Sequence, residues 1–142
     1  MGDFYQNGIV TTLHNLSQRS TDSVESELLE FSEDRRLGLI LPCLYSELET
    51  TAMPKILEQL CRVSYLNQLI IGLDCATQEE YTKALGIFSQ LPQNIKVLWN
   101  DGPRLKALDK KLQKLKLAPQ EMGKGRNVWY CFGYLLAANQ VE

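Results

Sequence analysis

Three short, largely apolar runs follow one another along the chain, at residues 37–41, 68–73 and 95–99. Runs of this length and composition are typical of strands that are buried on both faces of a sheet. Pro42 directly follows the first run, and because proline has no backbone N–H to donate, we expect that strand to end there. The pattern therefore predicts three buried strands.

Four other segments carry apolar residues at helical spacing, and they begin near Pro54, Thr77, Leu105 and Gly125. Thr77, with Glu80 three residues later, has the sequence of a capping box, which favours a helix start. The third segment carries five lysines opposite its leucines, as expected of a solvated helix face. The predicted apolar faces consist of Ile56, Leu57, Leu60 and Cys61; Tyr81, Ala84, Leu85 and Phe88; Leu105, Leu108, Leu112 and Leu115; and Val128, Cys131, Phe132, Leu135 and Leu136.

The order of the predicted elements, β-α-β-α-β-α-α, favours a mainly parallel sheet with helices on both faces. We therefore expect a three-layer, Rossmann-like α/β domain over residues 37–142, preceded by a lead-in arm at residues 1–36. Right-handed crossovers place the carboxyl ends of the three strands at one edge of the sheet. Ligands of such sheets bind in the crevice outside those ends, so we expect the functional site there.

Polar residues follow each predicted strand at this edge. A polar loop at residues 42–49 comes after the first strand, Asp74 ends the second, and Asp101 follows the third. Carboxylates in this place suit hydrogen bonds from the hydroxyl or N–H groups of a ribose or a base. Aspartate also caps turns, which leaves a local role open for either residue. We favour ligand binding for Asp74 and keep both interpretations for Asp101.

The segment Gly123–Arg126 precedes the last predicted helix. Glycines let the backbone approach a ligand closely, and a helix N-terminus carries partial positive charge. Lys124 and Arg126 add two full positive charges, so the segment suits a diphosphate. It lacks the spacing of a phosphate-cradling P-loop, and a solvated basic hinge between two helices is the alternative interpretation.

Composition narrows the choice of partners. The net charge of −2 gives no general field that attracts nucleic acid, and no apolar run reaches the length of about 20 residues that a membrane helix needs. The four cysteines have no CxxC spacing and the chain has one histidine, which predicts packing thiols and no metal site. With no signal peptide visible at the N-terminus, we expect a cytoplasmic protein.

Four segments together resemble the N-terminal part of GT-A glycosyltransferases, especially bacterial glucosyl-3-phosphoglycerate synthases and their relatives: Leu41–Glu47, Leu73–Asp74, Trp99–Pro103 and Gly123–Trp129. The likeness covers residues 37–138. In that group a Pro-Ala-Leu-like turn with a nearby glutamate holds the nucleotide base, a Leu-Asp pair faces the base and ribose, and a Gly-Lys-Gly loop contacts the nucleotide. The resemblance thereby implies nucleotide-binding roles for Pro42, Cys43, Leu44, Glu47, Asp74 and Lys124.

The chain departs from that group in three places. Cys75 stands where the group commonly has serine, and Arg126-Asn127 replaces a Glu-Ala-like pair. The group's Asp-x-Asp motif occurs nowhere in the chain. Because those carboxylates hold the divalent cation at the leaving diphosphate, we expect Mg²⁺ or Mn²⁺ in the full-length enzyme but no metal site here. The resemblance thus implies a domain truncated before its metal-binding strand, inactive alone, with an exposed sheet edge that favours self-association.

The leading hypothesis is the donor-binding portion of an enzyme that transfers a sugar from a nucleotide diphosphate to a small, phosphoglycerate-like acceptor. One alternative is a non-catalytic signalling or docking module with Asp74 as the phosphoacceptor. Such receiver modules add acidic residues after the first strand, where this chain has Leu41-Pro-Cys-Leu. Another alternative is a nucleotidyltransferase, although residues 42–46 are not the Gly-rich basic loop of that class.

Overall fold

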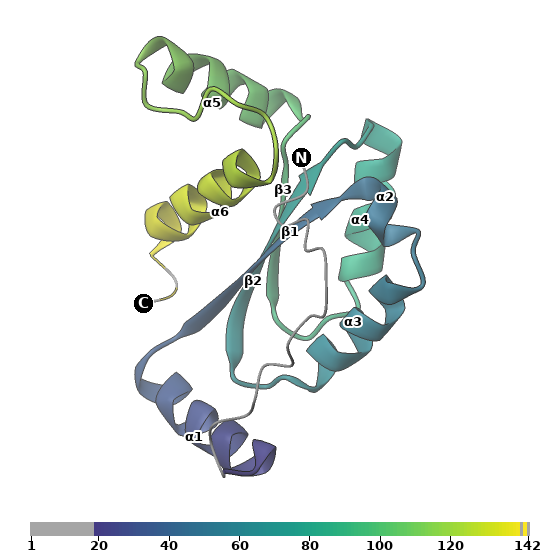
Figure 1. The fold of residues 1–142 in the computed structure, drawn as a ribbon, viewed down its shortest axis with the longest axis vertical. Helices are drawn as coiled ribbons and strands as arrows, with labels where there is room; N and C mark the ends of the chain where they lie inside the picture. The colour runs from purple at the N-terminus through teal and green to yellow at the C-terminus, as the bar shows by residue number, and fades with distance from the viewer. Residues whose placement is uncertain (1–18, 140, 142) are drawn as a thin grey trace, which may run out of the picture.

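The computed structural model describes residues 19–139 and 141, and it shows an α/β architecture with one parallel sheet (Figure 1). The described part contains helix α1 (Thr21–Asp34), strand β1 (Leu37–Leu44), helices α2 (Tyr45–Leu48) and α3 (Ala52–Arg62), strand β2 (Leu66–Asp74), helix α4 (Gln78–Phe88), strand β3 (Asn94–Trp99), and helices α5 (Pro103–Lys114) and α6 (Lys124–Ala138). The strands lie in the order β1-β2-β3. This confirms the predicted Rossmann-like α/β fold with its parallel sheet.

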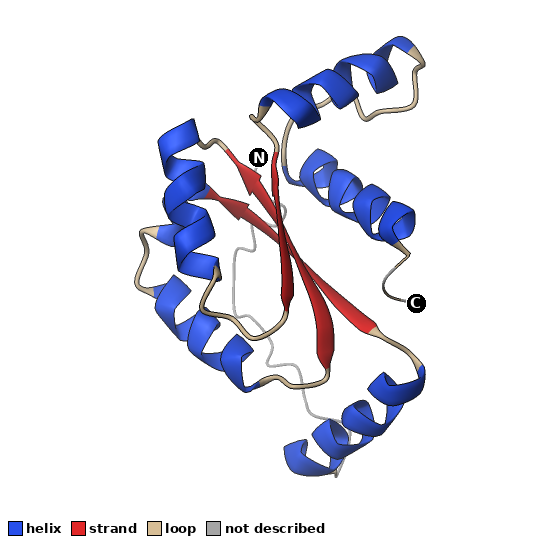
Figure 2. Cartoon of the chain, turned by 180° about the vertical axis from the view of Figure 1, so that it is seen from behind, coloured by secondary structure: helices blue, strands red, loops and turns tan. Residues whose placement is uncertain are grey.

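Three layers are visible when the chain is seen from either side (Figures 1 and 2). Helices α3 and α4 cover one face of the sheet, and α6 covers the other. Helix α1 lies beyond the start of β1 and buries none of its residues. It belongs to the predicted lead-in arm, of which residues 1–18 fall outside the described part. No described helix has the length and apolarity that a membrane span requires.

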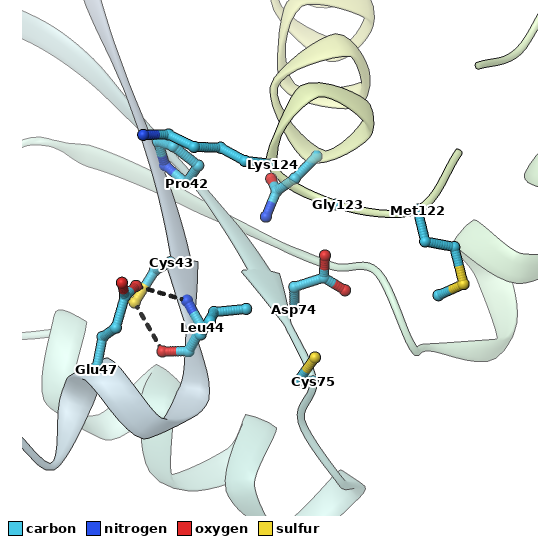
Figure 3. A pocket seen from close by; sticks show the side chains of 10 residues that line it. Pro42, Cys43, Leu44, Glu47, Asp74, Cys75, Met122, Gly123 and Lys124 are labelled. Atoms are coloured by element: carbon cyan, nitrogen blue, oxygen red, sulfur yellow. Dashed lines mark hydrogen bonds between the residues drawn. The ribbon is translucent and has the colours of Figure 1, made fainter. Parts of the chain in front are cut away.

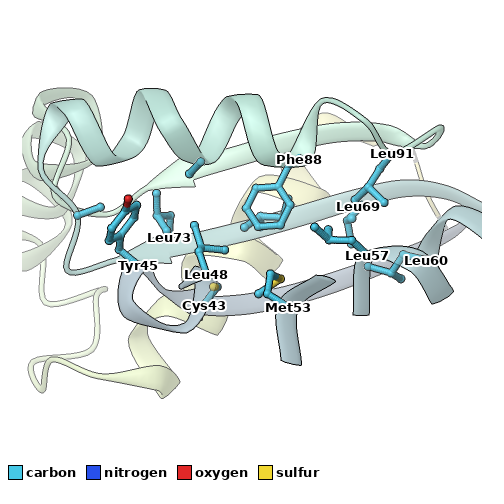
Figure 4. Close-up of a cluster of buried hydrophobic side chains, with 13 residues drawn as sticks. Cys43, Tyr45, Leu48, Met53, Leu57, Leu60, Leu69, Leu73, Phe88 and Leu91 are labelled. Atoms are coloured by element: carbon cyan, nitrogen blue, oxygen red, sulfur yellow. The ribbon is translucent and has the colours of Figure 1, made fainter. Parts of the chain in front are cut away.

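The main core lies between the sheet and the helices α3 and α4 (Figure 4). Leu69, Ile71 and Leu73 of β2 point into it and are fully buried, as is Phe88 of α4. Ile70, between them, points to the opposite face and packs beneath α6. Successive residues of β2 are therefore buried on opposite faces of the sheet, as its continuous apolar run predicted.

Strand β1 does not end at Pro42, contrary to the prediction, but continues to Leu44. Pro42 pairs in register with Gly72 of β2. Within the described residues β1 has β2 as its sole neighbour, so a missing N–H on its outer side removes no ladder hydrogen bond. Proline is therefore compatible with a strand at the edge of this sheet. The apolar run at residues 37–41 could not indicate by itself that its strand lies at an edge.

The apolar faces predicted for the last two helices are buried only in part. Helix α5 extends past the carboxyl ends of the strands and buries no residue (Figure 1). Helix α6 turns Cys131 and Leu135 toward the sheet, whereas Phe132 and Leu136 are 55% and 80% exposed. One helical step is about 100°, so the residue that follows Cys131 and the one that follows Leu135 are turned away from the sheet. Both helices thus present apolar side chains to solvent.

The capping box predicted at the start of α4 is formed. The Thr77 hydroxyl accepts a hydrogen bond from the Glu80 N–H at 3.3 Å, and the Glu80 carboxylate accepts one from the Thr77 N–H at 2.7 Å. The bond from the Thr77 N–H to the charged carboxylate lowers the pKa of Glu80. The α4 helix therefore begins at the residue that the sequence indicated.

Helix α5 ends in a Schellman motif whose left-handed position is occupied by Lys116, with φ 55°. The Leu117 N–H reaches the Leu112 carbonyl and the Lys116 N–H the Gln113 carbonyl, each at 3.0 Å. A lysine in this conformation is strained, whereas glycine is not. We expect Lys116→Gly to raise the free energy of unfolding by about 0.5–1 kcal/mol after the extra chain entropy of glycine is deducted.

Urea denaturation measures this change, and Lys110→Gly in the middle of α5 is the matched control. Lys110 is exposed, and glycine there should lower stability by somewhat less than about 1 kcal/mol. Equal destabilisation by both substitutions would show that Lys116 is not a favourable place for glycine.

Candidate functional site

A pocket of about 410 Å³ opens at the carboxyl ends of the strands (Figure 3). We call it the edge pocket. Its walls come from the end of β1 with the short helix α2 that follows, from the end of β2, and from the segment that begins α6. The lining residues are Pro42, Cys43, Leu44, Glu47, Asp74, Cys75, Met122, Gly123, Lys124 and Asn127. Segments about 30 and 50 residues apart in sequence thus meet where the parallel topology places them.

Six of the eight predicted site residues line the edge pocket: Pro42, Cys43, Leu44, Glu47, Asp74 and Lys124. Asp101 and Arg126 line a second pocket of about 220 Å³ instead. Met122 borders both pockets, so the two cavities are neighbours. The predicted residues therefore gather at one edge of the sheet but divide between two cavities.

Asp74 is the last residue of β2, and it is 8% exposed. Its carboxylate accepts no hydrogen bond and forms no ion pair with any residue in the described part of the chain. Its two oxygens are not among the fully enclosed, unpaired side-chain atoms of the described residues, so they reach the solvent of the edge pocket. Figure 3 shows this side chain directed into the edge pocket. It is consequently a free acceptor for a ligand that brings hydroxyl or N–H donors.

Lys124 lies opposite, as the first residue of α6. Gly123 before it adopts φ 136°, a conformation that glycine alone adopts readily, and so lets the chain turn sharply into the helix. The Lys124 side chain is exposed and extends toward Pro42 across the pocket (Figure 3), and it pairs with no carboxylate among residues 19–139 and 141. Together with the free N–H groups of the first helical turn, it makes this wall electropositive.

Glu47 shapes the loop that forms the third wall. Its Oε2 atom accepts a hydrogen bond of 2.8 Å from the Leu44 N–H, at the N-terminus of α2. Burial, together with the negative charge of Glu47, raises the pKa of the Cys43 thiol to about 12. Cys43 therefore remains a neutral thiol at physiological pH and contributes shape to the pocket rather than charge.

Asp101 supports the edge pocket from outside. One of its carboxylate oxygens accepts the Ala76 N–H at 3.0 Å, and the other lies 3.8 Å from the Lys106 ammonium. The Trp99 indole donates to the Ala76 carbonyl at 2.8 Å. These contacts hold the turn after Asp74, in which Cys75 takes the left-handed φ of 55°. In this structure Asp101 has the turn-capping role that was one of its two interpretations.

The second pocket contains a polar cluster that ties α5 to α6. The Arg126 guanidinium lies 3.8 Å from the Asp109 carboxylate, which also accepts a hydrogen bond from the Tyr130 hydroxyl. Burial and the Asp109 carboxylate raise the pKa of Tyr130 to about 12, so this hydroxyl keeps its proton. Arg126 is thus paired within the protein. Of the two cations in the segment Gly123–Arg126, Lys124 is the one that remains available to a ligand.

Sequence reasoning assigned no role to Asn127, Asp109 or Tyr130. Asn127 is buried in the floor of the edge pocket, where its side-chain amide donates to the Gly72 carbonyl at 2.7 Å. The signal available in the sequence was a polar residue one turn before Cys131 on an otherwise apolar helix face. Residues 19–139 and 141 contain no cluster of three potential metal ligands.

Comparisons with known proteins place the chain beside two curated relatives. It is 44% identical over 137 residues to the glucosyl-3-phosphoglycerate synthase of Persephonella marina, a match that covers 96% of this chain and 34% of that protein. It is 36% identical over 134 residues to the glucosyl-3-phosphoglycerate synthase of Methanococcoides burtonii, covering 92% of this chain and 32% of that protein. Both relatives are glycosyltransferases, and the resemblance predicted from the motifs is confirmed.

The chain spans about a third of the length of these relatives. No family model matches it. No solved structure matches it significantly.

Proposed function

We propose that this chain is the donor-binding part of a glycosyltransferase and that the edge pocket holds the nucleotide of the sugar donor. One observation carries the proposal. A buried carboxylate without a partner, Asp74, and an unpaired ammonium, Lys124, face a single cavity from opposite walls. A nucleoside diphosphate offers the complement of both, with hydroxyl and N–H donors at one end and negative charge at the other.

The two walls divide the ligand between them in this proposal. Asp74 accepts hydrogen bonds from the ribose or base, while Lys124 and the α6 N-terminus attract the diphosphate. The end of β1, which carries Pro42 and Leu44, supplies an apolar wall against which a flat base packs. The name that both relatives share, glucosyl-3-phosphoglycerate synthase, supports a glucosyl group as the sugar and a phosphoglycerate-like molecule as the acceptor.

A divalent cation does not fit the residues at hand. The described part of the chain lacks a cluster of acidic or other ligating side chains that would hold Mg²⁺ or Mn²⁺. We assign the metal ligands of the whole enzyme to the part of the relatives that this chain does not span. The same assignment applies to the acceptor site and to the catalytic residues.

Cys75 provides a direct test of whether nucleotides occupy the edge pocket. Its thiol is exposed and lines that pocket, whereas the exposed Cys61 of α3 lines a groove elsewhere. We expect a nucleoside diphosphate to slow the alkylation of Cys75 by iodoacetamide several-fold and to leave the rate at Cys61 unchanged. Peptide mass spectrometry measures both rates in one sample.

The reaction is carried out at alkaline pH, because desolvation and the negative charges of Asp74 and Asp101 raise the pKa of Cys75 above its usual value. Cys43 and Cys131 are buried and should react slowly with or without nucleotide. Unchanged alkylation of Cys75 at millimolar concentrations of every common nucleoside diphosphate would contradict the proposed function. Equal slowing at Cys61 would point to a general effect on the protein rather than to this pocket, and would contradict it as well.

A further inference from the structure

Helix α6 is fastened to the central strand by one buried polar side chain. The Asn127 side chain is 3% exposed, and its amide donates to the carbonyl of Gly72, 55 residues earlier, at 2.7 Å. Its oxygen accepts a weak hydrogen bond from the Cys131 thiol at 3.6 Å. Both polar ends of this amide are therefore satisfied inside the protein, as burial requires.

Gly72 is the matching half of this contact. A Cβ atom at position 72 would lie 1.7 Å from Asn127 Oδ1 and 2.7 Å from the sulfur of Cys131, distances that no packed structure tolerates. Glycine at this point of β2 thus leaves the space that the amide fills. An apolar side chain at 127 would also fill it, but only a hydrogen-bonding group fixes the helix in direction as well as in distance.

The contact lies between the two walls that the proposed function uses. Asp74 is two residues after Gly72 on β2, and Lys124 is nearly one turn before Asn127 on α6. The turn of α6 that carries Lys124 and Gly125 is exposed, and Asn127 is the first buried residue of the helix. A Cβ on Gly125 would have no neighbour within 4 Å, so the contacts that hold this turn are those of Asn127 and of Arg126, whose guanidinium lies 3.8 Å from the Asp109 carboxylate of α5.

We propose that Asn127, seated on Gly72, is a positioning residue that sets Lys124 over the diphosphate while Asp74 holds the nucleoside. The inference rests on the proposed function and extends it. It names the hydrogen bond between Asn127 and Gly72 as the contact that keeps the phosphate-binding lysine in place relative to the nucleoside-binding carboxylate. Asn127 acts through Lys124 and need not contact the ligand itself.

Asn127→Leu tests this role, because leucine keeps most of the volume and removes the hydrogen bond. The probes are the common nucleosides and their diphosphates, titrated calorimetrically into the 142-residue chain. We expect the affinity for the nucleoside to change less than about twofold. The ratio of diphosphate affinity to nucleoside affinity should fall about five- to tenfold, a coupling within the range found between neighbouring residues.

A double-mutant cycle with Lys124→Ala separates positioning from a general structural role. If Asn127 acts through Lys124, Lys124→Ala should weaken diphosphate binding strongly in the parent chain and very little in the Asn127→Leu background. Penalties that add, or an equal loss of nucleoside and diphosphate affinity in Asn127→Leu, would overturn the inference while the proposed function stands. Failure of the parent chain to bind any of the diphosphates would overturn both.

The triple variant Gly72→Ala/Asn127→Ala/Cys131→Ala keeps the test decisive if Asn127→Leu does not fold. It removes both the amide and the Cys131 sulfur that a Cβ at position 72 would meet, and the added methyl group occupies part of the vacated space, so its thermal unfolding should lie above that of Asn127→Ala/Cys131→Ala. With packing restored and the hydrogen bond still absent, it should show the same selective loss for the diphosphate. Recovery of the parent's diphosphate affinity in this variant would overturn the inference.

Discussion

Asp74→Asn should weaken the binding of a nucleoside and of its diphosphate by the same factor, about 10- to 150-fold. The substitution preserves the shape of the side chain but replaces an anionic acceptor with a neutral amide. A hydrogen bond to a charged group contributes about 1.5–3 kcal/mol, which converts to that factor at 25 °C. Asp74 lies at the end of β2 where the proposal places the ribose or base, so the loss should not depend on the phosphates. Calorimetric titration with each ligand measures it.

Glu79→Gln is the matched control for Asp74→Asn. Glu79 is an exposed carboxylate on α4, away from the edge pocket, and the same change of charge there should leave both affinities unaltered. Thermal unfolding should show no loss of stability in Asp74→Asn, because the carboxylate has no partner within the described residues to lose. A loss confined to the diphosphate would contradict the assignment of Asp74 to the nucleoside.

Lys124→Ala should have the opposite selectivity. We expect nucleoside binding to be unchanged and diphosphate binding to fall by about 1.5–3 kcal/mol at low ionic strength, because Lys124 supplies a full positive charge at an exposed helix N-terminus. The penalty should shrink as salt rises, since the Debye length falls from about 10 Å at 0.1 M to about 3 Å at 1 M. Titrations of parent and variant at both salt concentrations measure the difference.

Lys110→Ala, on the exposed side of α5 and outside both pockets, controls for the general loss of one positive charge. It should alter diphosphate binding little at either salt concentration. If Lys124→Ala weakens nucleoside and diphosphate equally, the Gly-Lys-Gly segment is not a phosphate site, and the hinge interpretation of it is the better one.

The fold was largely predictable because its main signals are local. The run before Asp74 indicates a buried strand, and the pair Thr77 and Glu80 marks a helix start, each without knowledge of the rest of the chain. The extent of β1 past Pro42 depends on that strand having one neighbour, which is a property of the sheet. The face of α6 likewise depends on what it packs against, and periodicity alone placed Phe132 inside.

The site was predictable to the extent that topology decides it. Parallel strands bring their carboxyl ends together, which is why Asp74 and Lys124 could be placed on one cavity. The link between Asn127 and Gly72, and the bond from Asp101 to the Ala76 backbone, join residues 55 and 25 positions apart. Such pairings need three-dimensional distances, and a single sequence carries no trace of them.

The alternative of a signalling module draws less support from the structure. Receiver modules place further free acidic residues beside the phosphoacceptor, whereas Glu47, the other carboxylate that lines the edge pocket, accepts a hydrogen bond from the Leu44 N–H at 2.8 Å. Both curated relatives are glycosyltransferases, and their shared name indicates no signalling role. The nucleotide-binding proposal uses Asp74 as an acceptor for a ligand that enters the pocket, which its burial permits.

The edge pocket is assembled from three stretches of chain that meet only after the sheet and α6 have docked. A molecule that fits it therefore binds the folded state and has no counterpart site in the unfolded chain. By thermodynamic linkage such a ligand raises the free energy of unfolding, by about 2.7 kcal/mol at a concentration one hundred times its Kd. The melting temperature of this chain can thus rank candidate bases and sugars by affinity, with no acceptor, metal or turnover needed.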